Sequence, residues 1–104
     1  SDFMGLVLST EEGDTGDMRR GVGTFVQRQP NNGLGIRNYP YSTDMTIQPS
    51  TYSDIAGYGD AVHSIGEVWC ATIWDLYWAF VEQDGWDGWC QCTFRVVFSL
   101  GLAQ

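Results

Sequence analysis

The chain has 104 residues, of which 13 are acidic and only five are basic, and its formal net charge at pH 7 is -8. The basic residues are all arginines and form no long basic segment, so the composition argues against nucleic acids and anionic membrane surfaces as partners. The hydrophobic fraction of 43% is sufficient for one folded domain or part of one, and the apolar stretches fall short of the roughly 20 residues that a membrane-spanning helix needs.

The first ten residues, SDFMGLVLST, are densely apolar. Their spacing alone fits a buried helix as well as a buried strand. We predict a short helix, interpreted as the second half of a longer one, although Ser1 is also a suitable N-cap. No basic segment followed by an apolar one opens the chain, so we expect no targeting signal within it.

Two further features are expected before residue 61. Val22, Thr24 and Val26 alternate with other residues and predict a short strand over residues 21–29, after a polar loop. Residues 30–60 contain all three prolines and show no periodicity, which predicts a long loop. Because this loop carries four tyrosines, we expect it to be ordered and packed on the rest of the fold: Tyr39, Tyr41, Tyr52 and Tyr58.

The strongest periodicity runs over Val62–Asp84, where apolar residues recur at three- and four-residue steps and predict a helix. Gly85 is placed to end it, and Ser64 and Glu67 have the spacing of a capping box at its start. His63 then lies where its side chain can face a cleft. Bulky aromatic residues on other faces predict a helix that is buried nearly all round: Trp74, Tyr77 and Trp78.

The cysteines and the histidine give weak signals by themselves. Cys70, Cys90 and Cys92 cannot all pair within one chain, and the Cys90-x-Cys92 spacing is too short for a zinc knuckle, so we interpret them as buried or incidental thiols. His63 is the only histidine, so any chemistry that needs an imidazole from this chain must use it. From residue type and position alone, a capping or packing role for this histidine stays open.

Three segments in order carry a resemblance: Ser1–Phe3, GIRNYPYST at residues 35–43, and residues 62–78. From Ser1 to about Asp87, the chain resembles the C-terminal part of the catalytic domain of fungalysin-type zinc metallopeptidases, relatives of thermolysin. The resemblance implies a mainly α fold with long ordered loops and at most a short β element, a fragment of the helical C-terminal subdomain. Residues 1–88 would form this partial domain, and residues 89–104 depart from the family pattern.

The resemblance also implies an activity and its requirements. The parent protein would be secreted and would hydrolyse peptide bonds of protein or peptide substrates with zinc-activated water. The zinc ligands and the general base are expected before Ser1, in the N-terminal remainder of the catalytic domain. We expect none of the metal ligands to lie in this chain. We therefore expect the isolated chain to be inactive.

Roles for three residues follow from the same resemblance. His63 matches the histidine that donates a hydrogen bond to the oxyanion formed when water attacks the peptide carbonyl. Arg37 matches an arginine that binds a substrate carbonyl, with an ordinary ion pair in the loop as the alternative. Asp2 matches a carboxylate that holds a zinc-ligating histidine by its other ring nitrogen. Glu67 is read as a capping residue and not as the general base.

Two other interpretations stay open. An acidic, aromatic-rich module could bind a carbohydrate or a peptide through exposed rings, without any chemistry. The chain could also be a truncated relic with exposed core faces, and the change of pattern suggests a disturbed reading frame near residues 87–89. The first alternative requires exposed tryptophans, whereas the predicted helix would bury Trp69, Trp74 and Trp78.

Overall fold

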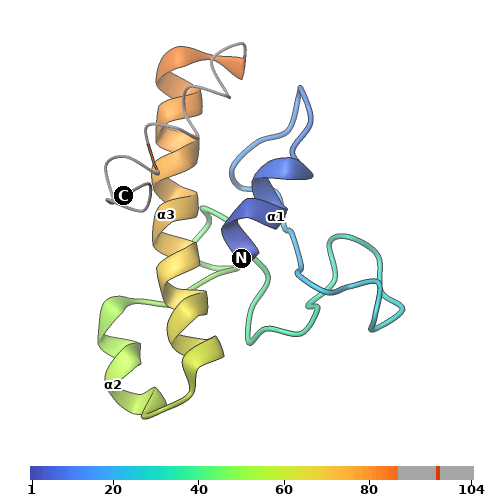
Figure 1. Cartoon of the computed structure of the whole chain (residues 1–104). Helices are drawn as coiled ribbons and strands as arrows, with labels where there is room; N and C mark the ends of the chain where they lie inside the picture. Colours follow the sequence, from blue (N-terminus) through green and yellow to red (C-terminus); the bar gives the residue numbers. More distant parts are fainter. Residues whose placement is uncertain (87–95, 97–104) are drawn as a thin grey trace.

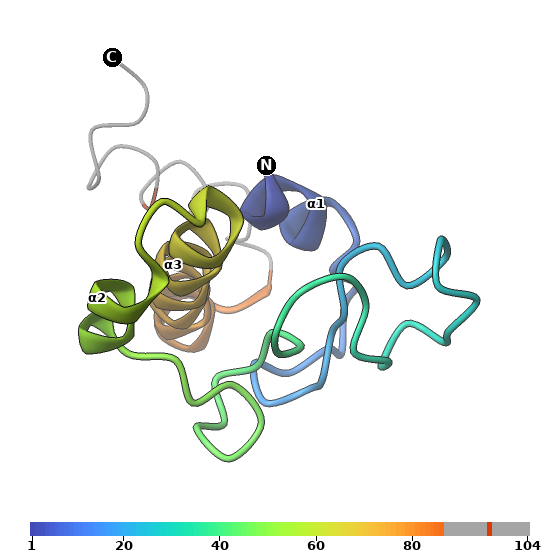
Figure 2. The ribbon, with the colours of Figure 1, turned by 90° about the horizontal axis from the view of Figure 1, so that it is seen from below.

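The computed structural model describes residues 1–86 and residue 96, and its regular elements are all helical. They are α1 (Asp2–Leu8), the 3-10 helix η1 (Tyr52–Asp54), α2 (Ile55–Tyr58) and α3 (Val62–Asp84). Helix α3 is the longest element, with α1 against its middle and α2 beside its N-terminal end (Figure 1). Viewed along α3, α1 and α2 lie on different sides of it and the long loops extend away (Figure 2). The predicted mainly α fold with long loops is confirmed.

Helix α3 has the predicted bounds. Gly85 follows its last residue with a φ of 77° and donates its N–H to the carbonyl of Val81 at 2.7 Å. Such a positive φ suits glycine, which lacks a Cβ, and it ends the helix there. The prediction that this helix is buried nearly all round is wrong, because Trp69 is 53% exposed and Val62 is 70% exposed. In the described part of the chain, α1, α2 and the loops cover only part of the surface of α3.

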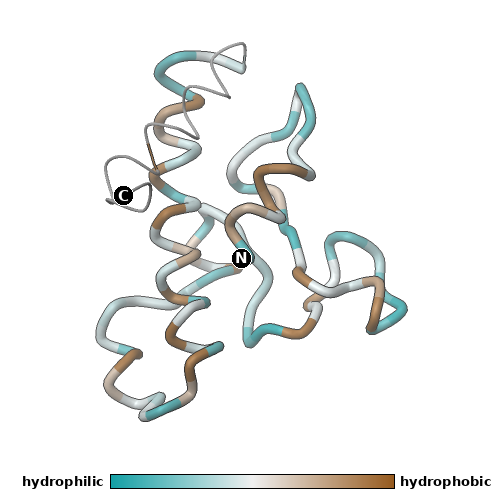
Figure 3. Tube along the Cα trace, in the orientation of Figure 1, coloured by the Kyte–Doolittle hydropathy of each residue, from teal (hydrophilic) through white to brown (hydrophobic). Residues whose placement is uncertain are grey.

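The core lies between α1 and the covered side of α3. Phe3 of α1 meets Tyr77 edge to face, with ring centroids 6.1 Å apart. Trp74 stacks on Tyr77 with centroids 5.3 Å apart, and Trp78 stands edge-on to both rings. These are the two geometries that aromatic pairs prefer. Figure 3 shows hydrophobic residues in α1 and at intervals along α3, whereas the loops alternate between hydrophilic and hydrophobic stretches.

The prediction of a strand over residues 21–29 is wrong. Val22 pairs with Gly35 in an isolated bridge, and no strand is formed in the described residues. Directly afterwards the chain turns, with the N–H of Gln27 donating to the carbonyl of Thr24 at 3.1 Å. A strand needs an extended partner as well as alternating side chains, and the neighbouring segment supplies only a single residue.

The long loop after residue 30 is packed on the core through one of its four tyrosines. Tyr41 is fully buried, whereas Tyr39 is 39% and Tyr52 is 79% exposed. The loop ends earlier than predicted, because η1 and α2 form before residue 60. Thr51 and Asp54 form a capping box at this point, a signal that the sequence contained and the prediction missed.

Several predictions concern the end of the chain. The change of pattern after Gly88, and with it Cys90 and Cys92, lies outside the described residues.

Cys70 is buried and free, which confirms that it is a buried thiol. None of the described helices has the combination of length and apolar character that crossing a membrane requires.

The bridge between Val22 and Gly35 generates a stability prediction. Gly35 has a φ of 71°, and a Cβ added there would overlap the carbonyl oxygen of Val22. We expect Gly35→Ala to lower the free energy of unfolding by about 2–5 kcal/mol through strain and overpacking. Gly57→Ala in α2 is the control, because its Cβ would meet nothing within 4 Å. Urea unfolding measures the free energy of unfolding of both variants. Equal values for Gly35→Ala and Gly57→Ala would contradict the close approach at the bridge.

Candidate functional site

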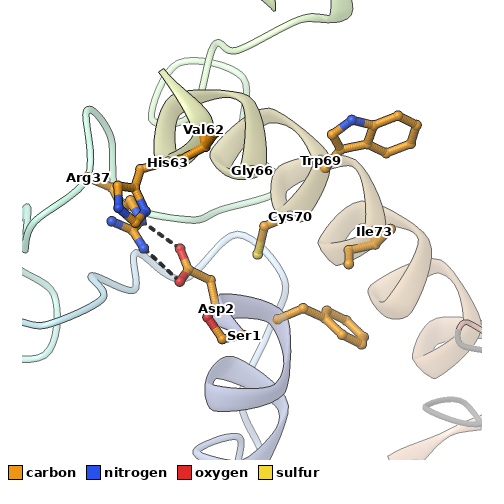
Figure 4. Close-up of a pocket in the computed structure, with 10 residues that line it drawn as sticks. Ser1, Asp2, Arg37, Val62, His63, Gly66, Trp69, Cys70 and Ile73 are labelled. Atoms are coloured by element: carbon orange, nitrogen blue, oxygen red, sulfur yellow. Dashed lines mark hydrogen bonds and ion pairs between the residues drawn. The ribbon is translucent and has the colours of Figure 1, made fainter. Parts of the chain in front are cut away.

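A cavity of about 320 Å³ lies between the N-terminal end of α1 and the first half of α3 (Figure 4). Asp2, Arg37 and His63 all line it, although they come from α1, from the long loop and from α3. Trp69, Cys70 and Ile73 add a largely apolar wall along α3. The structure thus brings the three residues singled out by the resemblance to one place.

Asp2 and Arg37 form a two-pronged ion pair at this cavity. Nε of Arg37 donates to Oδ2 of Asp2 at 2.8 Å, and Nη2 donates to Oδ1 at 3.0 Å (Figure 4). The side chain of Arg37 is 16% exposed and that of Asp2 is 12% exposed, so water competes little for these bonds. A planar guanidinium matches a carboxylate in this geometry, which fixes both side chains in orientation as well as in distance.

Tyr41 adds a third hydrogen bond to the same carboxylate. Its hydroxyl donates to Oδ2 of Asp2 at 2.8 Å from a fully buried position. The hydrogen bond from Arg37, with that from Tyr41, holds the pKa of Asp2 below its ordinary value against the opposing effect of burial. Burial raises the pKa of Tyr41, and the bond to Asp2 raises that of Arg37. At neutral pH the cluster therefore holds an anion, a cation and a neutral phenol.

His63 is the second residue of α3, and its exposed side chain lies at the edge of the cavity (Figure 4). Within the described part of the chain, no hydrogen bond or ion pair engages its ring. A neutral imidazole has one N–H donor and one acceptor nitrogen. His63 is thus available to a molecule that enters the cavity.

Glu67 does not form the predicted capping box, and this prediction is wrong. The N-cap of α3 is Ala61, without a side-chain hydrogen bond, and Ser64 lies inside the first turn. Oε2 of Glu67 instead accepts the N–H of Asn38 at 3.1 Å, and Oε1 accepts that of Tyr39 at 2.8 Å. The sequence did carry a signal, because a charged residue interrupts the apolar face of the helix.

Cys70 and the carboxylates do not provide a metal site by themselves. Burial raises the pKa of Cys70 to about 12, so this thiol is not an effective nucleophile at neutral pH. Among residues 1–86 and residue 96, no group of three His, Cys, Asp or Glu side chains could hold a metal ion. These residues alone therefore do not fit the ligand set of a catalytic zinc ion, which requires three protein ligands.

The tryptophans of α3 bear on the alternative of an aromatic binding platform. Trp74 is 0% and Trp78 is 3% exposed, so neither ring can stack on a ligand from solution. Trp69 is half exposed and lies at the cavity. On α3, a platform would therefore consist of a single ring.

The ion pair between Asp2 and Arg37 predicts a specific acid sensitivity. Because the pKa of Asp2 in the fold is below its ordinary value of 3.8, the pair stabilises the fold fully above that value. This stabilisation is lost as the pH falls through the lower, folded-state pKa. We expect Asp2→Asn to cost about 1–3 kcal/mol at neutral pH and to flatten the loss of stability between about pH 5 and pH 2.

Urea unfolding across this pH range checks the prediction. Asp60→Asn is the matched control, because Asp60 is exposed. If Asp2→Asn and the unsubstituted chain lost stability equally on acidification, the ion pair would not be the cause.

Comparison with known proteins identifies the relatives of this chain. A family model described as fungalysin metallopeptidase matches residues 1–98. Extracellular metalloproteinase 2 of Arthroderma gypseum is 37% identical over 84 residues, and that of Trichophyton rubrum is 36% identical over 84 residues. Each alignment covers 81% of this chain and 13% of the relative. Extracellular metalloproteinase 4 of Arthroderma otae is 35% identical over 85 residues, 82% of this chain and 12% of the relative.

The chain therefore spans only a small part, 12–13%, of the length of the curated relatives that it matches. The match nevertheless includes the segments that carry Asp2, Arg37 and His63. With a family model matched over residues 1–98 and relatives above 30% identity, the chain belongs to the fungalysin metallopeptidase family.

Proposed function

We propose that this chain is part of the catalytic domain of a secreted zinc endopeptidase and supplies two groups that act on the substrate, His63 and Arg37. The observation that carries the proposal is the cavity that these residues share with Asp2. Relatives named extracellular metalloproteinases support both the reaction class and the secretion. Because the chain spans a small part of those relatives, the activity is that of the longer protein.

When bound, the zinc ion supplies an activated water molecule and polarises the peptide carbonyl. Its ligands and the general base come, in this proposal, from the remainder of the catalytic domain that precedes Ser1. Asp2 would orient one of the ligating histidines through its other ring nitrogen. A carboxylate has about four lone pairs and Asp2 uses three, one of them on Oδ1, so Oδ1 can accept a ring N–H as well.

Arg37 retains donors for a substrate although it is paired. Of its five N–H groups, two donate to Asp2. The others can donate to a peptide carbonyl in the cavity that Arg37 lines. The ion pair and the substrate role are therefore compatible, and the pair holds the guanidinium in place before the substrate arrives, which lowers the entropy cost of binding.

His63 has the exposure and the freedom that an oxyanion donor needs. Its ring lines the cavity and has no partner among the described residues. A donor of this kind stabilises negative charge that develops on the carbonyl oxygen, an effect of about 3–4 kcal/mol. Such a bond strengthens in the transition state, so it accelerates the reaction more than it tightens substrate binding.

The apolar surface beside the cavity supports the proposed contact with the rest of the domain. Trp69 and Val62 line the cavity, and they are 53% and 70% exposed. Exposed apolar side chains that lie together can form a surface for contact with another part of a protein. In the proposal, the N-terminal remainder of the catalytic domain covers them.

The isolated chain provides the first test. We expect the 104-residue chain to show no proteolysis that a chelator abolishes, because no group of three side chains among the described residues could hold a metal ion. The measurement is release of peptides from denatured protein with zinc present. Chelator-sensitive cleavage by this chain alone would refute the division of roles.

The second test uses the longer protein that carries the complete catalytic domain. We expect His63→Ala to lower kcat about 100- to 1,000-fold, because one oxyanion donor is lost. Zinc content, measured by native mass spectrometry, should stay unchanged. Gln83→Ala, exposed at the other end of α3, is the control and should retain full activity. An unchanged kcat in His63→Ala would exclude the oxyanion role.

A further inference from the structure

Glu67 is a buried carboxylate without a cationic partner in the described part of the chain. Its side chain is 2% exposed, and the ion pairs found among residues 1–86 are Arg20–Asp14 and Arg37–Asp2. Burial of an unpaired carboxylate is costly unless hydrogen bonds replace its hydration. An apolar residue at this position of the helix would avoid that cost. The carboxylate therefore calls for a reason beyond packing.

The two oxygens of Glu67 hold the segment that follows Arg37. Oε2 accepts the N–H of Asn38 at 3.1 Å and Oε1 accepts the N–H of Tyr39 at 2.8 Å, so successive backbone donors each have their own oxygen. The side chain of Asn38 also donates to Oγ of Ser64 at 3.3 Å. Three hydrogen bonds thus fix residues 38–39 to the first two turns of α3.

We propose that Glu67 is a positioning residue that sets the place of Arg37 relative to His63. Arg37 directly precedes the held segment, and its guanidinium is fixed at the other end by Asp2 of α1. His63 lies four residues before Glu67 on the same helix, which places both on one side of it. The inference rests on the proposed function, because Glu67 touches no substrate and acts through Arg37.

The hydrogen bonds of Glu67 require a carboxylate and not merely a polar side chain of the same size. In this geometry each of the two backbone N–H groups donates to a different oxygen of the side chain. A glutamine has one oxygen and one NH2 group, so one of the two N–H groups would face another donor. Glu67→Gln therefore preserves the volume of the buried side chain while it removes one half of the attachment.

The test uses the longer peptidase with its complete catalytic domain and combines Glu67→Gln with Arg37→Ala. We expect Glu67→Gln to lower kcat/KM about 10- to 100-fold, as for other residues that orient a functional group, mainly through a higher KM. In the Arg37→Ala background the same substitution should have little further effect, because its route to the substrate is gone. Glu82→Gln, an exposed carboxylate on the same helix, should change nothing.

The Arg37→Ala background separates a positioning role from a general loss of folding, because misfolding would lower kcat/KM whether or not Arg37 is present. If Glu67→Gln lowered kcat/KM by the same factor with and without Arg37, or left it unchanged, the positioning role would be overturned. If Arg37→Ala alone left kcat/KM unchanged, the proposed function of Arg37 would fail instead. Hydrogen exchange of the Asn38 and Tyr39 amides would then still decide whether Glu67 holds them, by faster exchange in Glu67→Gln.

A milder variant covers the case in which Glu67→Gln does not fold. Ser64→Ala removes the hydrogen bond from the Asn38 side chain and leaves the carboxylate in place. We expect a smaller increase of KM that also disappears in the Arg37→Ala background. An unchanged KM in Ser64→Ala, with Glu67→Gln unfolded, would overturn the proposal.

Discussion

Two carboxylates determine where the long loop of this protein lies. Asp2 binds the guanidinium of Arg37, and Glu67 binds the backbone of the next two residues. Among the described residues the isolated bridges bond the backbone at Ile36 and Tyr41, on either side of residues 37–39, and no strand is formed between them. Side-chain oxygens therefore serve the role that a neighbouring strand has in a sheet. A loop held at two points in this way can present a side chain in a fixed orientation.

Apolar packing sets the position of α1 relative to α3 at the site. Phe3 of α1 lies against Tyr77 of α3, within the aromatic cluster of the core. This contact fixes the two helices that carry Asp2 and His63, and the carboxylates then add Arg37 from the loop. The cavity consequently has walls from three separate segments. Its shape depends on packing and on hydrogen bonding together, which makes it sensitive to changes outside its lining.

The sequence predicted the parts of this arrangement that depend on local pattern. The periodicity over Val62–Asp84 and the following glycine defined α3, because both act within a few residues. The prediction of a strand over residues 21–29 failed because a strand also depends on a distant partner segment. The fold supplies no such partner, and local pattern cannot reveal this. Glu67 was misread for a similar reason. Its hydrogen-bond donors lie 28 and 29 residues away along the chain, whereas the capping-box spacing was local.

Under the proposed function, the chemistry of the described site explains why it would form only one half of a catalyst. Arg37 and His63 can donate hydrogen bonds to a carbonyl or an oxyanion, which stabilises negative charge. The generation of a nucleophile requires a base with a free lone pair near the substrate. Asp2, the carboxylate at this cavity, accepts three hydrogen bonds, and in the proposal its remaining lone pair binds a histidine. Its lowered pKa also makes it a weak base. A site built from donors depends on another segment for its base, and the neighbouring exposed Trp69 offers that segment a surface on which to pack.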